Sequence, residues 1–204
     1  MTETDIHRIQ KHMASKKAHD ALNIWLEALD AADVSKVDAG TVAELTACMR
    51  ESVGFRDAIV MSIIGKNHPR YADSTLRDYA FDPERSQQLI PWFENTMRRA
   101  VTLGGQHEDF PRARCAITLL LAMAIAVTPT DKALATEPLA IAGYTLWWMG
   151  DPFAESVLRQ AFDINEGHTL ANLVQQGINT GYWPGHSDIS TENRPGIDKL
   201  ANGI

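Results

Sequence analysis

The fold is decided by residues 137–181, which read EPLAIAGYTLWWMGDPFAESVLRQAFDINEGHTLANLVQQGINTG. Apolar residues recur here at three- and four-residue steps, which predicts helices with one buried face over 137–149, over 153–163 and from about 166 onward. The turn between the first two helices is Met149–Gly150–Asp151–Pro152, in which the glycine can end one helix and the aspartate can cap the next. So short a turn predicts an antiparallel hairpin, and Asn165 is the expected N-cap of the third helix.

The order of helix, Gly-Asp turn, helix, short turn and third helix resembles a tetratricopeptide-type unit. In such units each hairpin buries its apolar face on the next one. Stable stacks generally need three or more repeats, and one unit is visible in this chain. The resemblance therefore predicts a tetratricopeptide-like packing geometry at the C-terminal end, without an array of repeats.

The hairpin and the turn after it carry a recognisable set of residues, Trp148–Met149–Gly150–Asp151, Ala154, Leu158, Ala161, Asn165–Glu166–Gly167, His168, Leu170 and Ala171. This set resembles the C-terminal signature of an actinobacterial family known only as domain of unknown function 4192. Upstream, Arg56–Asp57–Ala58 resembles a second element of that family. The resemblance covers the last two thirds of the chain. It departs from the family where Asn165–Glu166 replaces an Asp-Pro turn, and it implies a fold without implying an activity.

The whole chain has the composition of one globular domain. Its 204 residues are 45% hydrophobic and 22% charged, and they suffice for a single core. No alternating strand pattern of useful length is present, so we expect an all-α, single-domain helical bundle of about seven to eight helices over residues 1–183. Residues 184–204 are rich in Pro, Gly, Ser, Asn and Asp, which predicts a loop-like C-terminal tail.

Helix signals divide the rest of the chain. Asp38 or Thr41 can cap a second helix, and Gly65 and Pro69 end a third. Residues 66–81 are the least structured internal segment by pattern, with an exposed connection expected near residues 68–71. The other predicted helices are a long first helix over 4–31, one starting at Asp82–Pro83–Glu84, and an apolar one from Pro111 to Val127.

The net charge and the cysteines limit which partners and which cellular compartment are expected. A formal net charge of −7 argues against a generic nucleic-acid or acidic-membrane surface. The first helix holds a basic group that could still bind nucleic acid, although a solvated face is the favoured interpretation: His7, Arg8, Lys11, His12, Lys16, Lys17 and His19. Cys48 and Cys115 are interpreted as buried free thiols, and with no secretory signal pattern they indicate the cytoplasm. The apolar run over 115–127 is too short to cross a bilayer.

The sequence shows no catalytic or metal-binding constellation. No histidine pair has the spacing and adjacent acid of a zinc helix, and the two cysteines lack a paired-thiol spacing. The cluster His107–Glu108–Asp109 is interpreted as a solvated turn. Neither a Gly-x-Ser-x-Gly element nor a phosphate-binding glycine loop occurs. We therefore predict no catalytic residue, no metal and no cofactor, and we lean against an enzyme.

Besides nucleic-acid association through the basic first helix, two functional hypotheses remain open. The first is a non-catalytic helical interaction module, possibly self-associating. Adjacent indoles lie about 100° apart on a helix, so Trp147 or Trp148, with Tyr182 and Trp183 nearby, could contact another protein or a second copy. The core interpretation of the two tryptophans is nevertheless favoured.

The second hypothesis is an enzyme that binds a small ligand or a metal in a pocket between helices. Its candidate residues sit at helix starts, where anions are often held: Arg56, Asp57, Asp151 and His168. For Arg56 and Asp57 a structural interpretation is favoured, because the helix dipole also stabilises an acidic residue in a first turn.

Overall fold

The structure is a computed structural model of the chain. It describes residues 15–64, 73–82 and 110–184, together with residues 6, 8, 11–13, 85, 87, 90, 91, 94 and 95. Within these residues the regular structure is entirely helical, as predicted. The elements are α2 (Lys16–Ala31), the 3-10 helix η1 (Val34–Lys36), α3 (Ala39–Glu51), α4 (Val53–Ile64), α5 (Asp73–Phe81), α7 (Phe110–Val127), the 3-10 helix η3 (Lys132–Ala135), α8 (Thr136–Trp148), α9 (Ala154–Phe162) and α10 (Thr169–Asn179).

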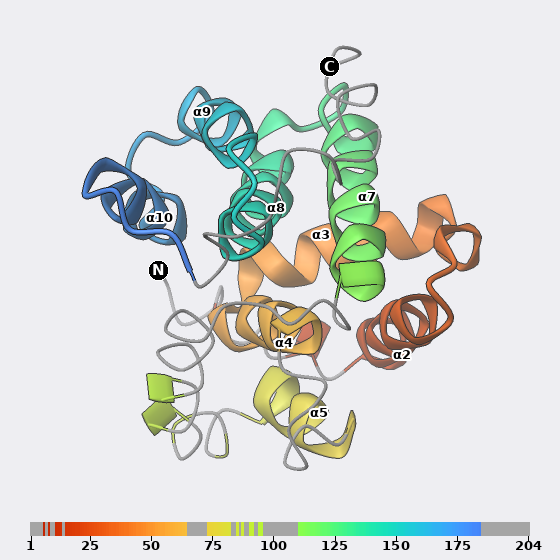
Figure 1. Ribbon diagram of the computed structural model, residues 1–204. Coiled ribbons are helices and arrows are strands. Elements are labelled where there is room, and N and C mark those ends of the chain that lie inside the picture. Colours follow the sequence, from red (N-terminus) through yellow and green to blue (C-terminus); the bar gives the residue numbers. More distant parts are fainter. Residues whose placement is uncertain are drawn as a thin grey trace.

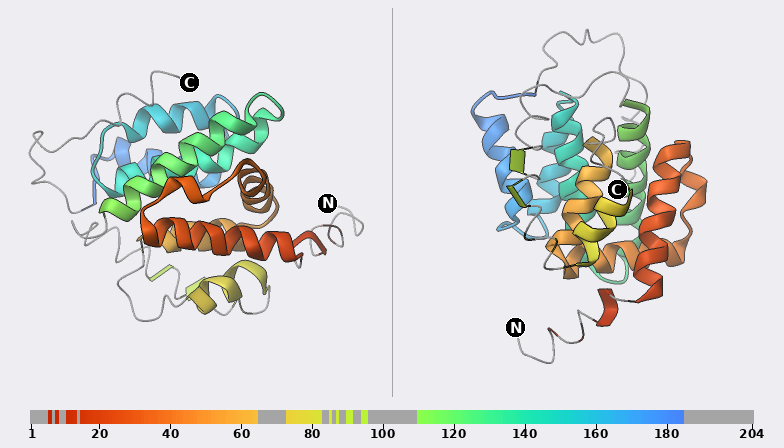
Figure 2. Two further views of the ribbon diagram at one scale, coloured as in Figure 1. Left: turned by 90° about the vertical axis from the view of Figure 1, so that its right-hand side faces the viewer. Right: turned by 90° about the horizontal axis from the view of Figure 1, so that it is seen from below.

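Helix α8 is the centre of the bundle (Figure 1). It contacts α3, α4, α7, α9 and α10, and every one of its residues except Glu137 is buried. Helix α2 packs on α3 and α7. Helix α5 packs on α4, on the side of the body opposite α9 (Figure 2, left). Because α8 is buried on all sides, it has almost no polar face. Helices α9 and α10 each have one buried side and one exposed side.

The α8–α9 turn has the predicted chemistry. Gly150 has a φ of 74°, its N–H donates to Trp147 O at 2.9 Å, and the next N–H, of Asp151, donates to Leu146 O at 2.9 Å. These two bonds satisfy carbonyls that the helix end would leave without partners. The Asp151 carboxylate accepts from Phe153 N at 2.9 Å within the turn. The N-cap of α9 is Phe153, without a side-chain cap, so Asp151 does not cap this helix itself, and α9 begins one residue later than predicted.

Helix α10 begins at Thr169, later than expected, because the predicted cap is wrong. The Asn165 side chain accepts from Gly167 N within its own turn. His168 is the N-cap, and its Nδ1 accepts from Ala171 N at 3.3 Å. Histidine is not a usual N-cap, so the pattern of the sequence pointed to the asparagine instead.

Two further predictions about helices are wrong. The long first helix over 4–31 is interrupted, because the Ser15 side chain caps α2 by accepting from Ala18 N at 3.2 Å. Part of the expected connection is helical: α5 spans Asp73–Phe81 and buries Leu76, Tyr79 and Ala80. These three buried residues, three and four positions apart, form too short an apolar pattern to predict a helix within a polar segment. The predictions over 66–72, 107–109 and 185–204 lie outside the described residues.

Helix α7 has the length and composition of a membrane span, with 18 residues and a mean hydropathy of 1.6. Two thirds of it, 67%, is buried against the rest of the protein. A helix in the core of a bundle passes the same test, so this observation is weak evidence for a membrane span.

Candidate functional site

The outer face of α10 combines an absence of charged side chains with an exposed leucine. Among their α-helices, α10 alone contains no Asp, Glu, Lys or Arg, although the whole chain is 22% charged. Its inner side buries Ala171, Val174 and Ile178 against the core. Its outer side exposes 56% of Leu173. Figure 1 and the right-hand view of Figure 2 place α10 at the edge of the body. Uncharged surfaces with exposed apolar side chains are typical of interface cores.

Uncharged amides surround Leu173. Gln176 and Asn179 are exposed and Gln175 is half-buried, and the Gln175 side chain donates to Asn179 Oδ1 at 2.9 Å. Each amide carries both donors and acceptors. The outer face of α10 can therefore form hydrogen bonds with a copy of itself as readily as with a different surface.

The tryptophans of the hairpin support this surface from below instead of forming it. Trp147 and Trp148 are 3% and 1% exposed, so neither can anchor a partner in this conformation. The Trp147 indole N–H donates to Tyr182 O at 2.9 Å, which fixes Tyr182 beside the end of α10. Tyr182 is 44% exposed and Trp183 is partly buried against the core. Of the four aromatic residues proposed from the sequence, Tyr182 is thus the one most available for contact.

Arg56 and Asp57 form a second, largely buried feature at the start of α4. The Arg56 guanidinium donates twice to Asp57 Oδ1, at 3.0 and 2.9 Å, and the two side chains are 15% and 13% exposed. Burial raises the pKa of Asp57, while the charge and hydrogen bonds of Arg56 oppose this shift. The negative charge of Glu137 raises that pKa further, and a hydrogen bond from Tyr79 of α5 lowers it.

Glu137 links this pair to His168. The His168 Nδ1 accepts a backbone hydrogen bond, so its Nε2 carries the proton in the neutral ring. Nε2 lies 3.1 Å from Glu137 Oε1, within ion-pair range but not aligned for a hydrogen bond. Glu137 Oε2 and His168 Nε2 are both buried, and neither has a hydrogen-bond partner among the residues that the structure describes. We call Arg56, Asp57, Tyr79, Glu137 and His168 the polar cluster.

Asp151 lies apart from the polar cluster. It follows the C-terminal end of α8, whereas Glu137 lies in the first turn of the same helix. The part of α8 from Glu137 to Trp148 alone spans roughly 16 Å. Of the four proposed pocket residues, Arg56 and Asp57 contact each other, and His168 contacts Glu137, whose charge acts on Asp57. Asp151 belongs to the α8–α9 turn.

The Asp57→Asn variant tests the electrostatics of the polar cluster. The ordinary pKa of the Asp57 carboxyl, 3.8, applies to the unfolded chain, and the pKa is higher in the folded state. Between these two pKa values the unfolded chain is ionised before the folded one, so the folded state loses stability as the pH rises. The stability of the wild type relative to Asp57→Asn should therefore fall as the pH increases through this window. Urea unfolding at a series of pH values measures the difference.

Asp38→Asn is the matched control, with the opposite sign. The backbone N–H of Thr41 donates to Asp38 and lowers the pKa of that carboxyl. The wild type should gain stability relative to Asp38→Asn as the pH rises towards 3.8. The two stability differences, wild type minus variant, should change with pH in opposite directions. The same direction of change for Asp57→Asn and Asp38→Asn would contradict the raised pKa of Asp57.

The fold and these surfaces define the class of protein: an all-α bundle around a buried central helix, with one uncharged outer helix and a buried polar cluster. The chain belongs to the family described as Domain of unknown function (DUF4192), whose sequence model matches residues 3–185. The match confirms the resemblance seen in residues 148–171 and extends it to the N-terminal part. No curated protein and no solved structure matches the chain significantly. The family relationship therefore supports no particular activity.

Some residues of interest were missed from the sequence. Glu137 joins the two family-like segments, yet alone it looks like an ordinary acidic residue in a first helical turn. His12 was placed on a solvated basic face, but it contacts Glu44 and Glu51 of α3. The spacing of residues 44, 48 and 51 on one helix side was the available signal.

Proposed function

We propose that the protein is a non-catalytic, self-associating helical module in which the outer face of α10 meets the same face of a second copy. The observation that carries this proposal is the absence of ionisable side chains from α10, combined with the exposure of Leu173 and Tyr182. Charged residues are depleted in the cores of interfaces, whereas exposed tyrosine is enriched there.

A second copy suits this face for two reasons. The chain carries a formal net charge of −7, so two copies repel each other, and an uncharged contact surface avoids adding like-charge pairs within the contact. The amides of Gln175, Gln176 and Asn179 can donate and accept, as a surface that meets itself about a two-fold axis requires. A tetratricopeptide-like geometry fits as well, because α10 then lies where the next helix of a stack would pack.

The compartment is part of the same proposal. Cys48 and Cys115 are both buried and free. Free thiols fit a reducing environment such as the cytoplasm, where self-association would not require disulfides.

The Leu173→Lys variant tests the surface. We expect the wild type to form a concentration-dependent dimer and the variant to dissociate at least about tenfold more readily, because a lysine would place an unpaired charge in the contact. Sedimentation velocity over a range of protein concentrations measures both. Ile125→Lys is the matched control, since Ile125 is 42% exposed on α7, away from α10. It should leave the dimer intact.

Equal weakening by both variants, or a wild type that stays monomeric at every concentration, would contradict the proposal. Circular dichroism of each variant separates loss of association from loss of folding. Since both positions are exposed, neither substitution should unfold the bundle.

A second candidate function is binding of a small polar ligand by the polar cluster. One observation favours it: within the described part of the chain, Glu137 Oε2 and His168 Nε2 are buried without hydrogen-bond partners, a state that costs free energy unless another group satisfies them. A small molecule that co-purifies with the wild type but not with His168→Ala would support this function. A wild type that carries no such molecule would remove its support.

A further inference from the structure

Helix α3 presents three potential metal ligands on one side. Glu44, Cys48 and Glu51 are four and three residues apart, which places them on the same face of the helix. Cys48 is fully buried, and the side chains of Glu44 and Glu51 are 18% and 25% exposed. The helix therefore leads from a buried sulfur to two carboxylates near the surface.

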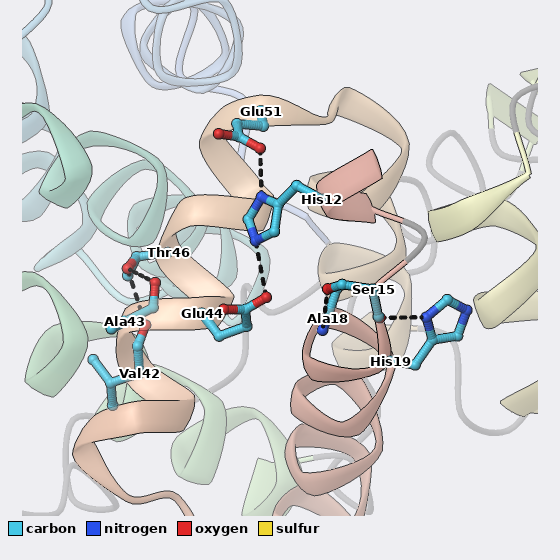
Figure 3. Close-up of polar contacts among 9 residues, drawn as sticks. All are labelled: His12, Ser15, Ala18, His19, Val42, Ala43, Glu44, Thr46 and Glu51. Carbon is cyan, nitrogen blue, oxygen red and sulfur yellow. Dashed lines mark hydrogen bonds and ion pairs between the residues drawn. The ribbon is translucent and has the colours of Figure 1, made fainter. Parts of the chain in front are cut away.

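His12 belongs to the segment that precedes α2, and its side chain lies against this face of α3 (Figure 3). Its Nδ1 is 2.6 Å from Glu51 Oε2, and its Nε2 is 2.9 Å from Glu44 Oε1. The ligand atoms of His12, Glu44 and Cys48 all lie within 4.8 Å of one another. Four groups that can bind metals thus meet where the N-terminal segment contacts α3.

We propose that this group is a metal site that binds one Zn²⁺-like ion through His12 Nε2, a Glu44 carboxylate oxygen and the Cys48 sulfur. A set of nitrogen, oxygen and sulfur ligands suits Zn²⁺, whereas Mg²⁺ and Ca²⁺ prefer oxygen alone. Ligands around Zn²⁺ lie about 3.5 Å apart, so small side-chain rotations would bring these three atoms to the ion. Water can take the fourth position, because His12 and Glu44 are partly exposed.

Glu51 is the positioning residue of this site. A histidine that binds a metal through one ring nitrogen usually donates its other N–H to a carboxylate, which fixes the tautomer and the orientation of the ring. The contact between His12 Nδ1 and Glu51 supplies that arrangement. It directs Nε2 towards Glu44.

The metal-free state has a different charge distribution. The hydrogen bond to Glu51, above all, and that to Glu44 raise the pKa of His12 against the opposing effect of burial. Burial and the two glutamates raise the pKa of the Cys48 thiol to about 12. Binding of the ion requires an unprotonated Nε2 and a thiolate, and the charge of +2 is balanced by Glu44 and the thiolate. An ion pair alone would not involve the thiol, and this difference separates the two interpretations.

Cobalt titration of the full-length, metal-stripped protein tests the site. Co²⁺ takes the place of Zn²⁺ and gives a thiolate-to-metal charge-transfer absorption when a cysteine is a ligand. We expect this absorption at one equivalent per chain and its loss when Zn²⁺ is added. The Cys48→Ser variant should lack it. Cys115→Ser is the matched control and should keep it, because Cys115 is also buried but faces Ala28 O on α2.

Glu51→Gln provides a graded measurement. Loss of a residue that orients a ligand typically weakens metal binding 10- to 100-fold. We expect this loss in Zn²⁺ affinity by calorimetry, with the cobalt absorption retained at saturation. The proposal is overturned if the wild type shows no charge-transfer absorption, or if Cys48→Ser and Cys115→Ser behave alike while circular dichroism shows that both are folded.

Discussion

Replacement of Trp25 by alanine is expected to lower the free energy of unfolding by about 3–5 kcal/mol. Trp25 is fully buried on α2, and its indole N–H donates to Ser62 Oγ of α4 at 2.8 Å. The Ser62 hydroxyl donates in turn to Ile59 O at 2.6 Å, and the Arg112 Nε of α7 donates to Ser62 O at 2.6 Å. The substitution would leave a cavity where these three helices meet.

Urea unfolding followed by circular dichroism measures this loss. Ser62→Ala is the comparison variant, because it keeps the indole but removes its acceptor. It should cost about 1–3 kcal/mol, the penalty for a buried donor without a partner. A loss below about 1 kcal/mol for Trp25→Ala would contradict the burial of Trp25 and its hydrogen bond to Ser62.

The Gly143→Ala variant is expected to be less stable than the wild type by about 1–3 kcal/mol. A Cβ atom at residue 143 would lie 2.6 and 2.7 Å from two side-chain carbons of Leu158 on α9. Because Leu158 is fully buried, its side chain has little room to move away. The substitution would therefore weaken the packing of α8 on α9, and α10 contacts both of these helices.

Gly40→Ala is the matched control in α3. Its Cβ would meet no atom closer than 3.5 Å, to the Asp38 side chain. The same substitution should there be neutral or stabilise by up to about 1 kcal/mol, through the smaller entropy of the unfolded chain. Thermal unfolding of the pair measures the contrast. Equal effects at the two positions would contradict the close approach of α8 and α9.

The hairpin could be predicted from the sequence because its turn is encoded locally. Gly150 and Asp151 act within a few residues of themselves, and the apolar spacing of α9 is regular. The buried state of both tryptophans was less certain, since it depends on helices that cover α8 from several sides. The break at Ser15 was missed because the apolar stripe continues through it.

The candidate sites depend on contacts between distant parts of the chain. His12 meets Glu51 across 39 residues and Glu44 across 32, and no local pattern specifies such a meeting. Arg56 and Asp57 could be noted as charges at the start of an apolar helix, but their neighbour Glu137 could not be identified. The uncharged state of α10 is visible in the sequence. Its exposure at the edge of the bundle is a property of the fold.

Native mass spectrometry of the gently purified, full-length protein tests self-association most directly. The account predicts a species of twice the 22.6 kDa chain mass that decreases on dilution and is lost in Leu173→Lys. A bare monomer at every accessible concentration, or a dimer that persists unchanged in Leu173→Lys, would contradict the claim that the outer face of α10 joins two copies.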